Sequence, residues 1–140
     1  MVGCMTTALK DIGLAVKRLQ WRHHREGNRR LAPVGLSLVQ WDVLRHLTLE
    51  PEASLHRLAE LTFQTDQAMG ELAKRMVDRG LLRREAGPGR IVHHRLTAGG
   101  EQTRTSGADV LDTVLDETVG TLSESERAEL LRLLMKAAGA

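Results

Sequence analysis

The sequence predicts a mainly α-helical protein that carries one small β-wing of two or three strands. Only three of its 140 residues are aromatic, so the core has to be built largely from Leu, Val, Ala and Met, which favours helices over a β-sandwich. Apolar residues recur three and four positions apart through most of the chain, as helices require. Between residues 81 and 96, two short apolar runs instead flank a Gly-Pro-Gly loop, which is typical of a hairpin.

Length and composition fit a single folded domain over residues 1–140, because 41% of the residues are hydrophobic and 27% are charged. The charge is uneven. Residues 1–96 hold 16 Lys and Arg against 10 Asp and Glu, whereas residues 97–140 hold 4 against 8, and a basic half suits a nucleic acid partner. With one cysteine, no secretion signal and no run near the roughly 20 apolar residues of a membrane span, we expect a cytoplasmic protein that makes no membrane contact.

The first two helices follow from apolar spacing and from helix-ending residues. The spacing predicts one helix over residues 5–26, after which Gly27 to Pro33 breaks the pattern. Ser37 begins the next helix, because Gln40 stands three residues later and completes a capping box. Pro51 ends that helix.

Residues 36–96 predict a helix-turn-helix followed by a wing. Ser54 caps a first helix over 54–62, and Thr65 caps a second over 65–79. At about 100° per residue, one side of the second helix packs and the other is free. The packed side holds Met69, Leu72, Ala73 and Met76, and the free side holds Gln67, Gly70, Glu71, Lys74 and Asp78.

The wing is expected over residues 81–96, after Gly80 ends the second helix. Leu81-Leu82 and Ile91-Val92 are its strand candidates. A helix that enters the major groove beside a basic hairpin is a DNA-reading arrangement, so double-stranded DNA is the expected partner.

The C-terminal part predicts a helix from Thr97 to about Gly120 and a last helix that opens with a capping box of Ser123 and Glu126. The Gly99-Gly100 pair makes the first of these a weak start by propensity. Both helices carry more apolar residues than a winged helix alone needs. Residues 5–26 and 98–138 are therefore expected to form dimerisation helices.

In order and in wording, the chain resembles the MarR family of winged helix-turn-helix regulators over nearly its full length. The resemblance is carried by GLSLVQWDVLRHL at 35–47, SLHRLAELTFQTDQAMGELAKRMVDRGLLRRE at 54–85 and RLTAGGE at 95–101. It implies a homodimer in which the N- and C-terminal helices interlock and each subunit offers one winged helix to half of a pseudo-palindromic promoter site. It also implies a repressor that a ligand releases.

The resemblance places base reading on Gln67, Ala68, Gly70 and Glu71, where Gln67 suits adenine and Glu71 suits cytosine. Side chains such as Lys74 and Arg75 are then expected to contact phosphates, and the wing-tip arginine is expected to enter the minor groove. The complete set of expected DNA-binding residues is Thr65, Gln67, Ala68, Gly70, Glu71, Lys74, Arg75, Arg84, Arg90 and His93.

Two departures from the family pattern keep an alternative open. Pro88 stands where the family wing usually carries an acidic residue, and Glu71 stands where an arginine or a neutral polar residue is common. The second helix is charge-neutral, so DNA affinity would rest on Arg83, Arg84, Arg90 and Arg95. The alternative is a winged-helix protein-interaction module with weak or no sequence-specific DNA binding.

Other functional readings are weighed against plain structural ones. Arg18, Trp21 and Trp41 are candidates for a pocket that takes a small aromatic or anionic effector, although Trp41 at helical spacing with Leu44 is equally core. Cys4 is read as an unreactive thiol rather than a redox sensor.

No cofactor, metal or enzymatic activity is expected. His93 and His94 point to opposite sides of a strand and do not easily share an ion. The sequence also carries no phosphate-binding loop, nucleophile triad or paired carboxylates.

Overall fold

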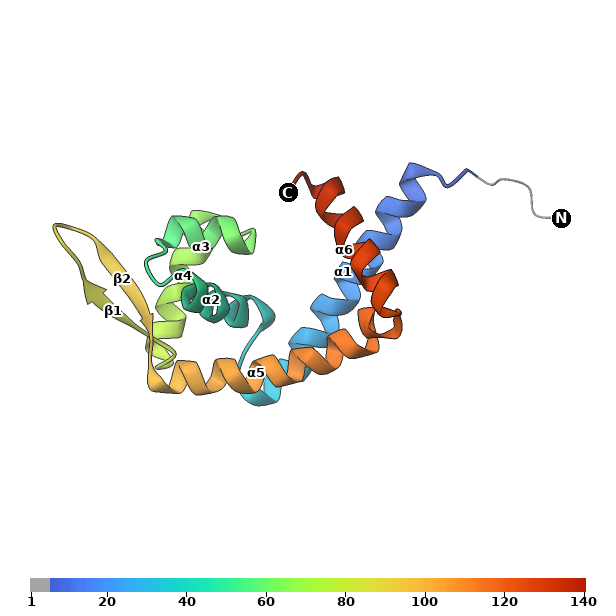
Figure 1. Cartoon of the computed structure of the whole chain (residues 1–140). Coiled ribbons are helices and arrows are strands. Elements are labelled where there is room, and N and C mark those ends of the chain that lie inside the picture. The colour runs from blue at the N-terminus through green and yellow to red at the C-terminus, as the bar shows by residue number, and fades with distance from the viewer. Residues whose placement is uncertain (1–5) are drawn as a thin grey trace.

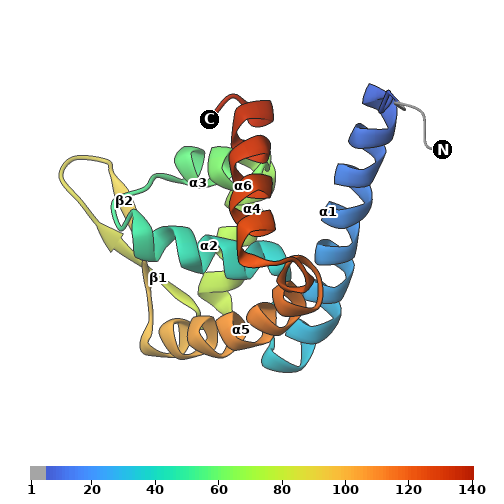
Figure 2. The ribbon, with the colours of Figure 1, turned by 45° about the vertical axis from the view of Figure 1, so that its right-hand side comes forward.

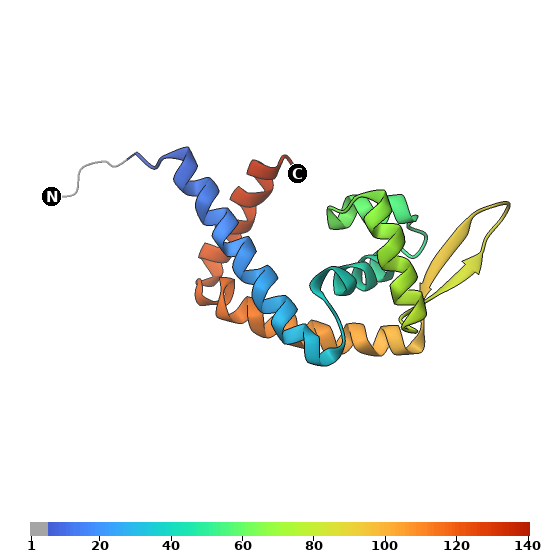
Figure 3. The same cartoon turned by 180° about the vertical axis from the view of Figure 1, so that it is seen from behind.

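The computed structural model describes residues 6–140, and a long helix, α5, joins a winged helix at one end to two helical arms at the other (Figure 1). In chain order the elements are α1 (Leu9–Leu31), η1 (Ala32–Val34), α2 (Leu38–Leu49), α3 (Leu55–Thr62), α4 (Asp66–Asp78), β1 (Leu82–Ala86), β2 (Val92–Leu96), α5 (Ala98–Glu117), η2 (Val119–Thr121) and α6 (Glu124–Ala138). The arms are residues 9–26 of α1 together with α6. They project as separate rods from the end of α5 that lies opposite the wing (Figures 2 and 3). The expected fold class is confirmed.

The core lies inside the winged helix. The stripe predicted for α4 is fully buried there and packs against α3 and β1. Leu31 and Leu111 extend this core from α1 and α5, which anchors the long helix to the winged helix. The largest completely buried side chains are Leu31, Val43, Leu44, Leu58, Met69, Met76 and Leu82.

Side-chain caps set the starts of α2 to α6, and each predicted cap is confirmed. In the first capping box, the Ser37 backbone N–H donates to Gln40 Oε1 at 3.0 Å and the Gln40 N–H donates to Ser37 Oγ at 3.3 Å. Ser123 and Glu126 form the second box. Thr65 accepts from the Ala68 N–H at 3.0 Å and thereby fixes where α4 begins.

The predicted break at Gly27 to Pro33 is wrong, because α1 continues through Gly27 to Leu31. Gly27 is buried where α1 crosses α5, and a Cβ there would lie 3.3 Å from Leu111 Cδ2. This glycine allows two helices to approach closely, and the helix ends only before η1, which contains Pro33. The helix therefore spans 9–31 in the described residues rather than 5–26.

The start of α5 shows the same principle. Its low helix propensity is offset by Thr97, whose Oγ1 accepts from the Gly100 N–H at 2.9 Å. Gly100 is buried against the backbone of Leu81, and a Cβ there would overlap the Leu81 carbonyl oxygen. Packing, not propensity, selects glycine at this position.

The wing is a two-stranded antiparallel hairpin that runs from Leu82–Leu96 at its base to Ala86–Val92 near its tip. Its strands extend further than the expected Leu81-Leu82 and Ile91-Val92 pairs, since β1 continues to Ala86 and β2 to Leu96. Pairing of the charged residues between these ends lengthens the ladder, and apolar runs alone did not reveal it.

Candidate nucleic-acid interface

Helices α3 and α4 form the helix-turn-helix, and α4 turns one whole side to solvent. Four of the expected DNA-binding residues on α4, Gln67, Glu71, Lys74 and Arg75, are exposed, as is the cap Thr65. Ala68 and Gly70 are half-buried beside them. Among residues 6–140, no carboxylate oxygen lies within 4.0 Å of the charged groups of Lys74 or Arg75. Both cations are therefore available to an anionic partner.

Arg79, at the end of α4, has a structural role. Its guanidinium donates to the Gly35 carbonyl oxygen and, at 3.3 Å, to Gln40 Oε1. These bonds fasten α4 to the turn before α2. Without Arg79, the exposed charges of α4 are two cations against Asp66, Glu71 and Asp78.

Helix α3 and the first residue of α4 share an exposed charge cluster whose pairing the sequence did not predict. His56 Nδ1 lies 2.9 Å from Asp66 Oδ1, and His56 Nε2 lies 3.8 Å from Glu60 Oε1. The hydrogen bond with Asp66, followed by the charges of both carboxylates, raises the pKa of His56 above its usual value. When protonated, His56 offsets negative charge beside the first turn of α4.

The wing has two chemically different faces, because side chains alternate along each strand. One face carries Arg84 opposite the buried His94. Burial, and then the Arg84 charge, lowers the pKa of His94. Arg84 itself is exposed, as is Arg90 at the tip, and neither makes an ion pair within the described residues.

The other face of the wing is tied to the loop between α2 and α3. Arg95 donates to the Pro51 carbonyl oxygen and to Glu52 Oε1 at 3.0 Å, and His93 Nδ1 lies 3.3 Å from Glu52 Oε2. Arg83 binds Glu85 at 2.7 Å on the same face and lowers the pKa of that carboxyl. His93 is thus half-buried against Glu52, whereas Arg84 and Arg90 are the wing arginines left without a carboxylate partner in residues 6–140.

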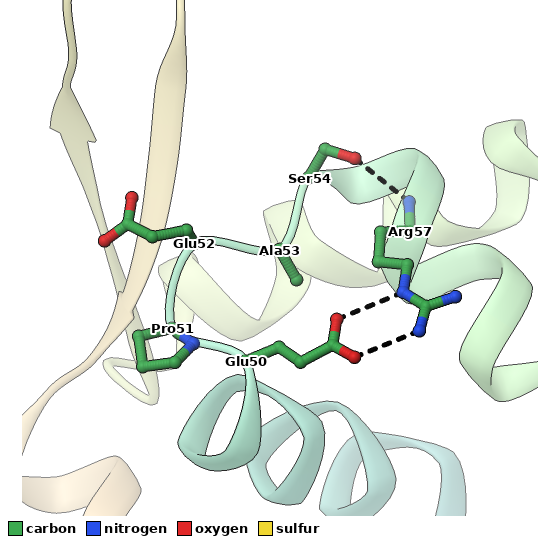
Figure 4. A pocket seen from close by; sticks show the side chains of 6 residues that line it. All are labelled: Glu50, Pro51, Glu52, Ala53, Ser54 and Arg57. Carbon is green, nitrogen blue, oxygen red and sulfur yellow. Dashed lines mark hydrogen bonds and ion pairs between the residues drawn. The ribbon is translucent and has the colours of Figure 1, made fainter.

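This loop also lines a cavity of about 460 Å³ (Figure 4). Arg57 reaches across it and donates to both oxygens of Glu50 at 3.0 Å, while Ser54 Oγ accepts from the Arg57 N–H. Because the cavity's one cation is held by Glu50 and Glu52 adds a second carboxylate, its lining does not favour an anion. The loop itself is held by Arg57 through Glu50 and by Arg95 through Glu52, so these lining residues serve to position α3 and the wing.

The three expected effector residues do not come together within one chain. Trp41 packs against α5, where its Nε1–H donates to the Arg104 carbonyl oxygen at 3.0 Å and Leu31 lies nearby. Arg18 and Trp21 lie about 20 and about 15 Å from Leu31 along α1, at 1.5 Å per residue. Both are exposed, and Trp21 stacks on His24 with ring centroids 5.8 Å apart.

Neither a cluster of metal-ligand side chains nor a membrane-spanning helix occurs in residues 6–140. These residues gather no group of three His, Cys, Asp or Glu side chains that suits a metal ion. Across the same range, every helix falls short of the length and apolar content needed to span a bilayer. Cys4 lies outside the described residues.

Comparison with known proteins agrees with this geometry. A family model described as MarR family matches residues 34–91. The transcriptional regulator HosA of Escherichia coli is 32% identical over 103 residues, which cover 72% of this chain and 76% of HosA.

Solved structures extend the similarity over nearly the whole chain. The MarR family protein Rv2887 of Mycobacterium tuberculosis in complex with salicylic acid is 27% identical, with a TM-score of 0.75 over 94% of this chain and 97% of that chain. Its complex with DNA is 25% identical, with a TM-score of 0.73 over 94% and 98%. The chain therefore belongs to the MarR family and is a DNA-binding transcriptional regulator.

Proposed function

We propose that this chain forms a homodimer that represses transcription by occupying a pseudo-palindromic promoter site, and that a small aromatic acid releases it. The observation that carries the proposal is the pair of uncovered surfaces at opposite ends of α5. Unpaired cations lie on α4 and the wing, and apolar side chains lie on the arms.

The arms supply the argument for two copies. α6 has no buried residue at all in the single chain. Leu131, Leu134 and Met135 on α6 and Ile12 and Val16 on α1 are all 40% or more exposed. Apolar residues gathered in this way mark an interaction surface, and a second copy covers them through the commonest symmetry of protein oligomers.

The winged helix supplies the argument for DNA. In a dimer, two copies of α4 would enter successive major grooves about 34 Å apart. Gln67 then reads adenine and Glu71 reads cytosine, while Lys74 and Arg75 bind phosphates. Arg90 reaches the minor groove from the wing tip, and Arg84 adds a cation on the wing face opposite Glu52. His93, the remaining expected contact, also faces Glu52 at 3.3 Å, so this pairing competes with any contact that it makes with DNA.

The argument for an effector rests on the junction between α2 and α5. Arg104 Nε is buried there without a hydrogen-bond partner in residues 6–140, although the Nη2 of the same guanidinium binds Glu101, and the Arg104 backbone carbonyl accepts from the Trp41 indole N–H. A carboxylate would satisfy that donor and an aromatic ring would pack on the indole. Salicylic acid, the ligand bound by Rv2887 in its solved complex, has both groups.

The test begins with selection of bound fragments from genomic DNA, followed by fluorescence anisotropy at two salt concentrations. We expect a palindromic site, and we expect Arg75→Ala and Arg90→Ala each to weaken binding and to lower the salt slope by about 2, since a dimer loses one contact in each subunit. Arg45→Ala is the matched control, because this exposed arginine lies on α2, outside both the proposed DNA contacts and the arms. A slope unchanged in both test variants would contradict the proposed contacts.

One observation favours a second candidate, a protein-interaction module. With Arg79 bonded to Gly35, the exposed face of α4 carries more carboxylates than cations. Such a module would bind every selected fragment weakly and without sequence preference. Tight binding to one palindrome excludes this candidate.

A further inference from the structure

Phe63, in the turn of the helix-turn-helix, combines a left-handed backbone with an exposed aromatic ring. Its backbone is left-handed, with φ 58° and ψ 38°, and it is the one non-glycine residue with a positive φ among residues 6–140. Its side chain is 94% exposed, more than any other large apolar side chain of the described part. The turn has to close here, because the Phe63 N–H caps α3 by donating to the Glu60 carbonyl oxygen at 3.4 Å.

Both features cost free energy in the isolated chain. The left-handed conformation brings Cβ close to a carbonyl oxygen, so glycine or asparagine would occupy it with less strain. An aromatic ring that stays in water gains none of the stabilisation that burial gives. Phenylalanine at this position is therefore explained only if the ring becomes buried against a partner.

The position of Phe63 favours DNA as that partner. Phe63 stands two residues before Thr65, the cap of α4. The chain between these two residues spans at most about 7 Å. The N-terminal turns of α4 are the part of the molecule that enters the major groove in the proposed complex. The carboxylate of Asp66, the first residue of α4, is bonded to His56, which reduces its repulsion of a phosphate near the start of that helix.

We propose that Phe63 is an apolar DNA contact, with its ring packed on a thymine methyl group or on a deoxyribose at the edge of the major groove. This inference rests on the proposed function. It also explains how α4 binds without a net positive charge, because an apolar contact adds affinity that does not depend on phosphate neutralisation.

The test compares Phe63→Asn with wild type on the selected palindrome. Asparagine tolerates the left-handed turn, so the urea midpoint of unfolding should be unchanged or higher. Operator affinity should fall about a hundredfold, because the dimer loses two half-buried phenyl rings at about tenfold each, and the salt slope should be unchanged because no charge is removed. Phe63→Leu, which restores an apolar side chain, should recover part of the loss.

Two further results separate the outcomes. Replacing each thymine of the site with deoxyuracil removes its methyl group, and an affinity loss in wild type that disappears in Phe63→Asn identifies the methyl as the contact. If Phe63→Asn lowers operator affinity but deoxyuracil does not change the affinity of wild type, the contact is with the deoxyribose. Wild-type affinity in Phe63→Asn overturns the inference, whereas a wild type that selects no site at all overturns the proposed function itself.

Discussion

The winged helix and the arms of this molecule share the same helical spacing of apolar residues, but only the winged helix buries those residues within one chain. Most of the buried apolar side chains lie between Leu31 and Leu82, in the winged helix and its junction with α1. In contrast, α6 buries nothing, and residues 9–26 of α1 include no buried side chain. One region has a finished core within the chain, and the other has the apolar half of an interface.

The joint between the two regions shows why the arms stay in place without a core. Arg30 binds Glu117 through two hydrogen bonds of 3.1 and 2.5 Å, and His23 Nε2 lies 2.7 Å from Thr118 Oγ1. These polar contacts lie where α1 crosses the end of α5. They hold α1 against the end of α5, whereas burial against a partner is left to stabilise the apolar sides of the arms.

The largest expected effect breaks the finished region. Gly100→Ala places a Cβ into the Leu81 carbonyl, a backbone group that has no rotamer to escape by. We expect unfolding to become easier by about 3 kcal/mol, measured as a lower urea midpoint. Gly99→Ala is the matched control, because its Cβ would lie 3.7 Å from the nearest atom and alanine favours helix. An equal loss of stability in both variants would contradict the close approach of Gly100 to the Leu81 carbonyl.

How far the sequence reaches can be judged from these same elements. The boxes at Ser37 and Ser123 and the buried stripe of α4 were predictable, because each depends on residues within about four positions. Gly27 was misread as a break since its reason lies 84 residues away, at Leu111. A local pattern cannot distinguish a glycine that ends a helix from one that lets another helix approach.

The site divides in the same way. Exposure of Lys74 and Arg75 follows from helical periodicity alone. The partners of His93, Arg95 and Arg79 do not, because the α2–α3 loop and the turn at Gly35 meet them only in the folded chain. Phe63 carried no sequence signal beyond its polar surroundings, since a left-handed backbone shows only in the structure.

The next effect breaks the unfinished region. Ile12→Glu puts a charge on the apolar side of α1, and two-fold symmetry counts each substitution twice in a dimer. We expect the dimer dissociation constant to rise at least a hundredfold, about 2.8 kcal/mol, in sedimentation equilibrium. Leu49→Glu is the control, because Leu49 is 64% exposed against 48% for Ile12 but belongs to the winged helix. If only Leu49→Glu dissociated the dimer, the dimer interface would not lie on the arms.

A smaller effect compares one cap from each region. Ser37→Ala and Ser123→Ala each remove a capping-box acceptor and should cost about 1 kcal/mol. For Ser37→Ala, the loss of unfolding free energy should not vary with protein concentration, because the core that α2 joins is complete in one chain. For Ser123→Ala, the loss of unfolding free energy should become smaller as dilution separates the dimer. Ser106→Ala, at an exposed position inside α5, should not lower the free energy of unfolding at either protein concentration.

The smallest expected effect is a change in pH dependence. Burial lowers the pKa of His94 in the winged helix and of His23 at the α1–α5 joint, so the unfolded chain takes up protons more readily at both positions. Their stabilising contribution is present above the ordinary histidine value of 6.5 and is lost as pH falls through the lowered pKa values.

His94→Leu should therefore flatten the decline of the urea midpoint below pH 6.5, because leucine fits beside Leu82 and Leu96 on the same wing face and takes up no proton. Val92→Ala, an exposed substitution on that strand, should keep the wild-type slope. His23→Gln should flatten the decline less, since His23 is only half-buried. A larger effect at His23 than at His94 would mean that the joint of the arms, rather than the wing, governs stability in acid.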